Sequence, residues 1–524
     1  MNTLCRSILG LIGALALAGA AHAQVPSSND TSDNNLNTGM GTGALGGPAA
    51  SNGGSSNTAS GFQALFSNTT GGNYNAAFGW EALSGNTTGS NNTASGYGAL
   101  YNNTSGADNT AAGYETLNFN TTGADNTASG YEALYSNTTG SSNVASGGYA
   151  LYSSTSGVNN TASGYQALYY NTTGNDNTAS GYEALYLNTG NNNAASGSRA
   201  LRSNTTGNDN TASGYEALYS NTTSYQNTAT GSGALYSNVS GNYNTAAGYQ
   251  ALYSNASGAS NTASGVGALY SNISGFGNAA YGVAALYSNT TGSYNTASGL
   301  GALNLTTTGN NNTASGYNAL SSNQTGSDNT TSGYQALLSN KNGSQNTAYG
   351  ENALYTATAS FNTAVGYESL YKNKSGRYNV ALGWKAGFAL TTGDNNIDID
   401  SQGEAGESDT IRIGTQGTQT QTFIAGIYEN PGVCCDYVVV DANGQLGTAS
   451  PPPGANVKTA YMTRVLKQVQ RQAAEIRDLK KQQLAFQAEQ VRMQQQMAEL
   501  TTLNEATQVA LQKLQAKDEL VAQR

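Results

Sequence analysis

Apolar positions recur along this chain at a spacing much longer than a helix turn or a strand alternation. The pattern Asn-x-Ala-x-Gly, with its close variants, starts twenty times; sixteen of the nineteen intervals between starts are 17 residues and three are 16 or 18. Such a strict period is typical of a repeat protein in which each copy forms one structural unit. The starts are Asn57, Asn75, Asn92, Asn109, Asn126, Asn143, Asn160, Asn177, Asn193, Asn210, Asn227, Asn244, Asn261, Asn278, Asn295, Asn312, Asn329, Asn346, Asn362 and Asn379.

The unit at residues 126–142 shows what each repeat is expected to build. Thr127–Tyr131 and Ala133–Ser136 are predicted to be two short strands. The Asn-Thr-Thr-Gly sequence that begins at Asn137 is predicted to turn the chain, since Asn and Gly tolerate positive φ. Stacked units of this kind predict a mainly β fold, a parallel β-solenoid or β-roll of about 20 seventeen-residue coils over residues 57–392.

Alternation along the first strand predicts which side chains point inward. Ala128 and Gly130 fall on one face, and with Leu134 they are expected to fill the interior, because a seventeen-residue coil encloses little volume. Thr127 and Ser129 fall on the outer face. Coils about 4.8 Å apart give a rod of roughly 95 Å that carries ladders of Tyr, of Thr or Ser, and of Asn.

Tyr131, Tyr135 and their copies are too large for that interior and are expected at the surface or in an interface. A continuous tyrosine stripe exceeds the apolar patch that monomers normally expose, so packing against identical copies is expected. Stacking on sugars is an alternative role for these rings. The Thr and Ser rows resemble the threonine arrays of ice-binding solenoids, although a solvated strand face is the simpler explanation.

The period ends near residue 392, where a second pattern begins. Short segments of alternating apolar character predict strands and hence a small β connector over residues 393–450. The proline run that follows predicts a stiff linker at residues 451–457. The predicted strand segments are 397–399, 410–414, 422–427 and 438–440.

Residues 458–522 follow a heptad pattern. From Met462 onward, twelve of the eighteen a and d positions are apolar, which predicts an α-helical coiled coil of about nine heptads. Polar Gln and Asn at the other core positions are expected to fix register or strand number. A single amphipathic helix that folds back on the solenoid is the alternative. The positions expected to mediate trimerisation are Met462, Val465, Val469, Ile476, Leu479, Phe486, Met493, Met497, Leu500, Leu511 and Leu514.

Residues 1–23 have the features of a bacterial secretory signal peptide. Arg6 precedes an apolar run over residues 8–21, and Ala21-His22-Ala23 supplies the small residues of a cleavage site. No later segment approaches the ~20 apolar residues of a membrane-spanning helix. The sequence therefore predicts an exported protein, located outside the cell, on its surface or in the periplasm, with a flexible polar, Gly-rich segment at residues 24–56 and no integral membrane segment after cleavage.

Composition excludes most catalytic chemistry. His22 is the only histidine among 524 residues and lies in the predicted signal peptide, so the mature chain lacks Ser-His-Asp catalysis, Cys-His catalysis and His-ligated metals. The acidic residues within 394–409 lack EF-hand spacing. We therefore predict no enzyme activity, no catalytic residue, no cofactor and no metal site.

Charge and cysteine content bear on partners. Only 10% of residues are charged and the net charge of −10 leaves no basic patch, so nucleic-acid binding is not expected. Cys434 and Cys435 are the only cysteines of the predicted mature chain. Because adjacent cysteines rarely bond to each other, they are either free thiols or the source of disulfides between chains.

The repeats resemble the left-handed β-roll heads of trimeric autotransporter adhesins, whose shorter repeats carry a motif similar to Asn-Thr-Ala-Val-Gly at residues 362–366. Residues 396–447 look like the connector of bacterial tail-fibre-like proteins. The resemblance implies a homotrimer of β-rods. Two departures are expected: after residue 447 no self-cleaving chaperone domain follows, and residues 517–524 do not resemble the amphipathic strands of a membrane anchor.

These features together predict an exported, structural or adhesin-like fibrous protein. Its repeated side-chain ladders are expected to contact host or cell-surface glycans or proteins. The alternative is a carbohydrate-binding protein similar to a phage tail fibre, and an ice-binding solenoid is a third possibility.

Overall fold

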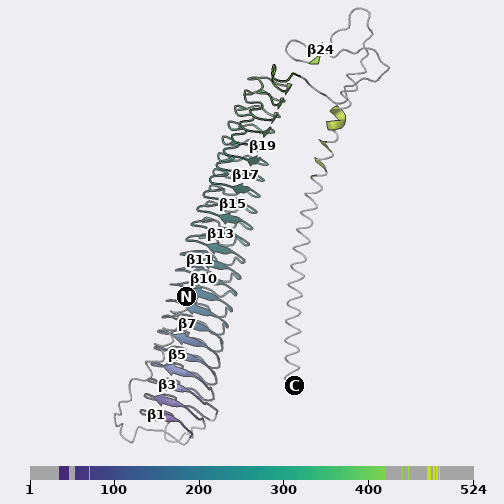
Figure 1. Cartoon of the computed structure of the whole chain (residues 1–524). Coiled ribbons are helices and arrows are strands. Elements are labelled where there is room, and N and C mark those ends of the chain that lie inside the picture. The colour runs from purple at the N-terminus through teal and green to yellow at the C-terminus, as the bar shows by residue number, and fades with distance from the viewer. Residues whose placement is uncertain are drawn as a thin grey trace, which may run out of the picture. The chain divides into compact units, whose positions relative to one another are not determined.

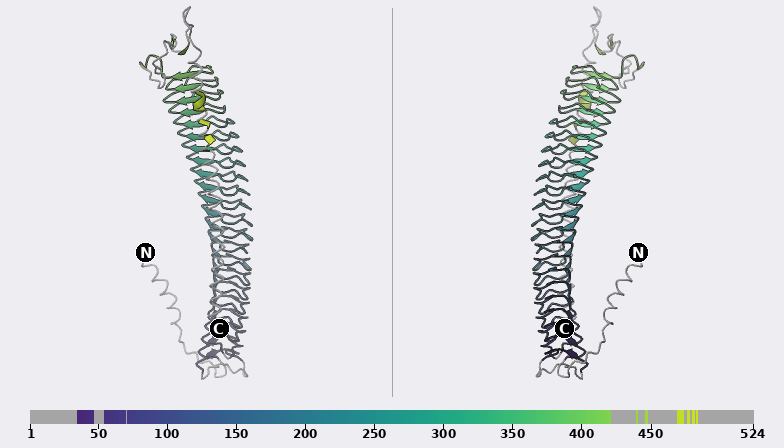
Figure 2. Two further views of the ribbon diagram at one scale, coloured as in Figure 1. Left: turned by 90° about the vertical axis from the view of Figure 1, so that its right-hand side faces the viewer. Right: turned by 90° about the vertical axis from the view of Figure 1, so that its left-hand side faces the viewer.

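The computed structural model describes residues 35–46, 54–69 and 71–420, together with short stretches between residues 439 and 483. The chain divides into two units, Met1–Thr418 and Gln419–Arg524. In the first unit, 23 strands of three residues each form one parallel sheet along a rod of stacked coils (Figure 1). The same stack is seen from two opposite sides in Figure 2, and its sheet runs from β1 to β23.

The strands are β1 (Thr38–Met40), β2 (Thr58–Ser60), β3 (Ala76–Phe78), β4 (Thr93–Ser95), β5 (Thr110–Ala112), β6 (Thr127–Ser129), β7 (Val144–Ser146), β8 (Thr161–Ser163), β9 (Thr178–Ser180), β10 (Ala194–Ser196), β11 (Thr211–Ser213), β12 (Thr228–Thr230), β13 (Thr245–Ala247), β14 (Thr262–Ser264), β15 (Ala279–Tyr281), β16 (Thr296–Ser298), β17 (Thr313–Ser315), β18 (Thr330–Ser332), β19 (Thr347–Tyr349), β20 (Thr363–Val365), β21 (Val380–Leu382), β22 (Ile397–Ile399) and β23 (Ile411–Ile413).

Each strand pairs in parallel with the strands of the coils before and after it. At β6, Thr127 lies between Thr110 of β5 and Val144 of β7, and Ala128 lies between the corresponding alanines. Equivalent residues therefore form straight columns along the rod. The predicted mainly β fold, a parallel solenoid of seventeen-residue coils, is confirmed.

The sheet extends beyond the twenty repeats marked by the sequence pattern. β1 pairs with β2 although the buried Asn37 and Asn57 that precede these strands are 20 residues apart. At the other end, β22 and β23 continue the same sheet, with Ile397 opposite Ile411. These two strands lie within residues 393–450, so part of that segment is solenoid.

Each coil contains one strand, and the prediction of a second strand over Ala133–Ser136 is wrong. These residues form turns. The reason is an alternation of backbone conformations, because Glu132 and Leu134 have φ of 49° and 54°, and the same positions are left-handed throughout the rod. Left-handed residues reverse the chain where a strand would extend it, and they turn Leu134 inward.

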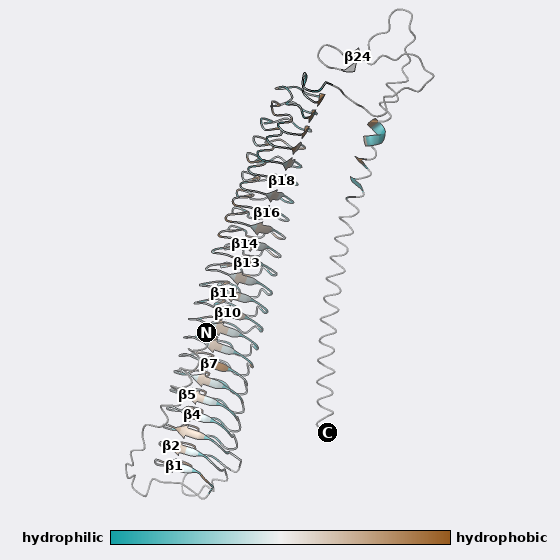
Figure 3. Ribbon diagram, viewed as in Figure 1, coloured by the Kyte–Doolittle hydropathy of each residue, from teal (hydrophilic) through white to brown (hydrophobic). Residues whose placement is uncertain are grey.

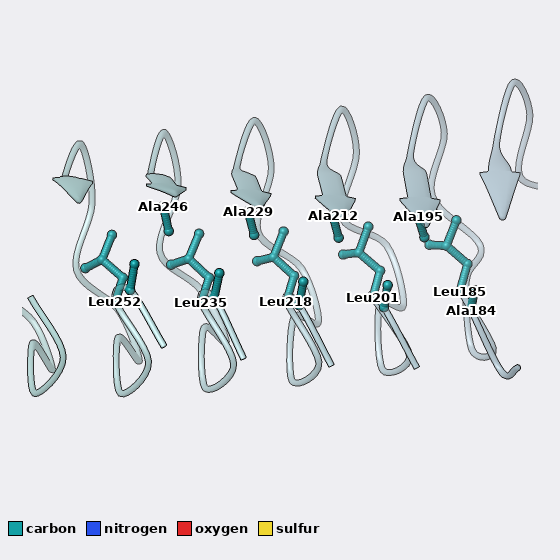
Figure 4. Close-up of a cluster of buried hydrophobic side chains, with 14 of the residues drawn as sticks. Ala184, Leu185, Ala195, Leu201, Ala212, Leu218, Ala229, Leu235, Ala246 and Leu252 are labelled. Carbon is teal, nitrogen blue, oxygen red and sulfur yellow. The ribbon is translucent and has the colours of Figure 1, made fainter. Parts of the chain in front are cut away.

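The interior is a column of small apolar side chains and one leucine per coil. Ala128, Ala133 and Leu134 are fully buried, as are their copies, which confirms the inward prediction for Ala128 and Leu134. In Figure 4, Leu201, Leu218 and their neighbours repeat at the same level of successive coils. Gly130, predicted to point inward, is half-buried beside the next coil.

Two columns of buried asparagine complete the interior. Asn126 uses both its backbone N–H (3.0 Å) and its Nδ2 (3.1 Å) to donate to Oδ1 of Asn109, and its Nδ2 also donates to the carbonyl of Gly140 at 2.9 Å. Asn137 belongs to the second column, where its Nδ2 donates to Oδ1 of Asn120 at 2.7 Å. The side-chain N–H groups of both asparagines are thereby paired in the interior.

The second unit is described only in short stretches. β24 (Val439–Val440) pairs antiparallel with β25 (Leu446–Gly447). Residues 469–473, 476–477, 480–481 and 483 are helical. The remainder of the predicted coiled coil and the proline-rich linker lie outside the described residues.

Candidate functional site

The outward side of the sheet, here called the strand face, is formed by the first and third residues of strands β1–β23. From β4 to β18 the first position is mostly Thr and the third mostly Ser, and most of these side chains are exposed, as Thr127 and Ser129 show. No charged residue occupies either position in these fifteen strands. The strand face is thus a regular double row of hydroxyl groups over most of the rod.

Tyrosine rings form two further columns on the surface. The Tyr131 ladder occupies the position after the half-buried glycine, and Tyr114 and Tyr131 stack there with centroids 5.1 Å apart and planes 4° apart. The Tyr135 ladder lies four residues later, and Tyr135 stacks on Tyr152 at 5.2 Å and 2°. Tyr131 is 47% exposed whereas Tyr135 is half-buried, so the two ladders differ in what they offer to a partner.

The Tyr135 ladder spans ten successive coils, nine of which supply a tyrosine. Its last part comprises five rings whose centroids are 4.9–5.2 Å apart and whose planes lie within 8° of parallel. Arg202 stands where a tyrosine is missing, with its guanidinium 4.9 Å from the ring centroid of Tyr186 and 5.9 Å from that of Tyr219. A cation–π contact on each side therefore bridges the two stacks. The five rings are Tyr219, Tyr236, Tyr253, Tyr270 and Tyr287.

This stacking decides which part of each ring can meet a partner. Within a run, the ring faces are directed at the neighbouring rings, so the ring edges and hydroxyl groups remain for contact with solvent. Sugars stack on aromatic faces, which these rings already use for one another. The ladders therefore offer hydroxyl-lined edges, and exposed faces only where a run ends.

A short chain of ion pairs marks the coil that contains Arg202. Arg199 lies between Glu183 (3.4 Å) and Glu216 (3.3 Å) of the two adjacent coils, and Nε of Arg202 donates to Glu183 at 2.7 Å. Burial acts to raise the pKa of Glu183, but hydrogen bonds from Arg202 and Tyr182 and the nearby positive charges lower it overall. The glutamate is thus held ionised within the tyrosine surface.

The coil that contains β22 carries a buried carboxylic acid. Asp398 occupies the inward position that Ala381 holds in the preceding strand, is 1% exposed, and has an Oδ2 atom without a hydrogen-bond partner. Burial, reinforced by the charge of Glu407, raises the pKa of Asp398 to about 7. Arg412 faces it from β23 but is already bound to Glu407 by hydrogen bonds of 2.7–3.1 Å.

The acidic residues around Asp398 are dispersed by the fold. Asp394 accepts the backbone N–H of Arg377 at 2.7 Å, and Asp409 accepts Nδ2 of Asn395 at 2.9 Å. Within the described part of the chain, no group of three or more His, Cys, Asp or Glu side chains is arranged to hold a metal ion.

Few of the residues predicted to mediate trimerisation can be placed. Val469 and Ile476, two successive a positions, lie in helical stretches and are 58% and 56% exposed. The other nine, and Cys434 and Cys435, lie outside the described residues. The sequence pattern did not single out Arg202 or Ile411, although each departs from the residue type that the repeats carry at the same position. Alignment of the repeats with one another reveals both departures.

Two further observations bear on the class of protein. None of the helical stretches in the described residues has the length and apolar character needed to cross a bilayer. Comparison with protein families, with curated proteins and with solved structures found no match to this chain.

Proposed function

We propose that this chain is an exported, non-catalytic structural protein of the adhesin type, in which a rigid rod presents repeated side-chain ladders to another surface. The observation that carries the proposal is the register of the sheet, which places equivalent exposed residues of 23 strands in straight columns. Repetition multiplies a weak contact, because each engaged coil raises the effective concentration of the next.

The same proposal includes association into a homotrimer through the C-terminal helix. Val469 and Ile476 support it, because two apolar side chains one heptad apart are exposed in a single chain and would be buried by partner helices. Light scattering on the mature chain tests this directly. A stable mass of about three chains is expected, and a stable single-chain mass contradicts association.

Hydroxyl groups dominate the surface that the rod offers, so glycans and proteins of cell surfaces fit as contacted partners. Binding of the purified mature chain to a glycan array and to whole cells tests this part, with release of reducing sugar measured in parallel. Binding without sugar release is expected. Sugar release would contradict a non-catalytic role, and absence of binding to every surface would contradict the adhesin role.

Location is tested by fractionating cells that produce the full chain. We expect the rod in the medium or on the cell surface, accessible to added protease. Retention of the full-length protein, with an intact N-terminal segment, in the cytoplasm would contradict export.

Ice is a second candidate partner, favoured by the double row of exposed Thr and Ser on the strand face. Its test is thermal hysteresis of the purified rod. The matched variant replaces Thr161, Thr178 and Thr211 by Val, the residue that position 144 already carries in the same column. Hysteresis that falls in this variant would support ice binding, and its absence from the wild type would exclude it.

A further inference from the structure

The strand face changes chemistry at the end of the rod that precedes the second unit. From β4 to β18 its residues are mostly Thr and Ser, but in β21, β22 and β23 every outward residue is Val, Leu or Ile. Figure 3 shows this shift as strands that turn brown toward β23. We call these six residues the apolar end. They are Val380, Leu382, Ile397, Ile399, Ile411 and Ile413.

The apolar end is continuous and accessible. In the first column Val380 pairs with Ile397 and Ile397 with Ile411, and the third positions pair in the same order. Exposure reaches 40% for Val380, 49% for Leu382 and 67% for Ile411. Tyr349, 45% exposed, extends the third-position column on the β19 side. Six large aliphatic residues therefore face outward together, whereas most outward residues from β4 to β18 carry hydroxyls.

The fold does not require these residues. Strands β6, β8 and β9 have the same register with Thr and Ser at the same two positions. The interior of the coils is filled by other residues, such as Leu370 and Ala381. A large apolar side chain at an outward position that accepts Thr or Ser elsewhere points to a contact outside the coil.

We propose that the apolar end is where identical copies of this chain meet, so that three rods are joined over their last coils while their Thr and Ser faces upstream remain in solvent. This inference rests on the proposed homotrimer. It adds that the interface is confined to β21–β23.

Size favours copies of this chain over an independent partner. Three strands about 4.8 Å apart span only about 10 Å along the rod, so the apolar end is too small to bury the ~800 Å² per partner that is typical of a separate stable complex. β23 ends at Ile413, six residues before the second unit begins at Gln419, and that unit carries the heptads from Met462 onward. Helices that associate would hold the last coils of the copies at high effective concentration, where a small contact is sufficient.

Symmetry also fits a second copy. The columns run along the rod, so copies related by an axis parallel to the rod place the same residue types at the same height. Aliphatic rows would then meet aliphatic rows. The strand face brings no charge to this contact, because Asp398 and Arg412 occupy the middle positions of their strands.

Cysteine pairs test the proposal in the full mature chain, in which Cys434 and Cys435 are first replaced by Ser. Leu382→Cys reports on the apolar end, and Ser213→Cys, at the same strand position in β11, is its matched control. Mild oxidation or a short bismaleimide should link chains through position 382 and not through position 213. Maleimide labelling at 382 should be slowed about tenfold relative to 213, as for a site that reacts only when the contact opens.

The outcomes separate the inference from the proposed function. A trimeric mass with cross-linking at 382 supports both. A trimeric mass with fast labelling and no cross-linking at position 382 overturns the inference but leaves the trimer. Slow labelling without interchain links has the same meaning, because position 382 would then be covered by another part of its own chain. A single-chain mass overturns the trimer itself.

A second variant restores the repeat consensus with Val380→Thr, Leu382→Ser, Ile411→Thr and Ile413→Ser. Circular dichroism should be unchanged because the other coils fold with these residues. Cross-linking in a trimeric state should fall when the apolar end is removed, measured with Ile399→Cys in β22 as the reporter and with Ser332→Cys in β18, outside the apolar end, as the background. The matched control is Val144→Thr, which restores the consensus residue in the middle of the rod and should leave cross-linking unchanged. Equal cross-linking in the two variants would overturn the inference.

Discussion

Asn126 donates to Oδ1 of Asn109 through two groups at once, its backbone N–H at 3.0 Å and its side-chain Nδ2 at 3.1 Å, and Oδ1 of Asn126 accepts the same pair of bonds from Asn143. One side chain thus ties three coils together. This repeated pair of hydrogen bonds sets the register of the rod, because no other side chain of this size offers both a carbonyl acceptor and an N–H₂ donor.

Replacing Asn126 by Ala should be costly. It removes the acceptor of the buried backbone N–H of Asn143 and one donor to Oδ1 of Asn109, whereas the carbonyl of Gly140 keeps Nδ2 of Asn137 as a donor. A buried polar group left unpaired costs about 1–3 kcal/mol, so a local loss of that size is expected. Hydrogen exchange across β5–β7 measures it, and Thr127→Val is the exposed control that should leave exchange unchanged.

The second asparagine column contains a natural break, from which a stabilising substitution follows. Ser154 occupies the position of Asn137 one coil later, and both Oγ of Ser154 and Oδ1 of Asn137 are buried without a partner. Ser154→Asn would supply the missing Nδ2 donor. The gain should be about 1–2 kcal/mol, seen as slower hydrogen exchange in the coils of β7 and β8. Faster exchange would show that the amide does not fit there.

Two positions with positive φ should differ in how well they tolerate substitution. Gly130 has φ of 139°, and a Cβ there would lie 2.5 Å from the carbonyl oxygen of Gly147, so Gly130→Ala should disrupt stacking. Glu132 has φ of 49°, but Gly98 and Gly233 already occupy the same position in other coils. Glu132→Gly should therefore change stability by no more than about 1 kcal/mol. Thermal unfolding of the two variants, compared side by side, provides the measurement.

The raised pKa of Asp398 predicts that the last coils of the rod become less stable as the pH rises. In the unfolded chain its carboxyl ionises near 3.8, whereas burial raises the pKa to about 7 in the fold. Between these values the folded state binds more protons, so the free energy of unfolding falls with pH, by at most about 1.4 kcal/mol per pH unit, and levels off above 7. Hydrogen exchange in β21–β23 at pH 5 and pH 8 measures the change.

Asp398→Asn and Asp398→Ala are the controls for this pH effect. Both remove the titrating group, and Ala is the residue that the preceding coil carries at this position. Each variant should show little difference between pH 5 and pH 8 and should exceed the wild type at pH 8. A pH dependence that persists in both variants would assign it to other groups.

The period of the sequence predicted the architecture because it is imposed by stacking, in which each coil must repeat the shape of its neighbour. Ala128 and Leu134 were placed correctly on that basis alone. The second strand was not, because Ala133–Ser136 has apolar alternation but lies between left-handed residues, and nothing in the residue types of Glu132 or Leu134 signals positive φ.

The ends of the rod were harder to predict than its middle. The buried asparagines that precede β1 and β2 are 20 residues apart, and β22 carries Asp398 where the motif has alanine, so neither end matches the pattern that marks the other coils. The surface ladders could be foreseen as columns, but the parallel stacking of their rings depends on side-chain rotation, which the sequence leaves open.

The asparagine columns also give the rod an electrical direction. Where the amides of the two columns are paired, each donates toward the β1 end and accepts from the β23 side. Amide dipoles of about 3.5 D therefore add head to tail and polarise one another, as peptide dipoles do along a helix. The β1 end carries the positive pole of this array and the opposite end the negative pole, so the field of the rod favours approach of anionic groups at the tip farthest from the second unit's attachment.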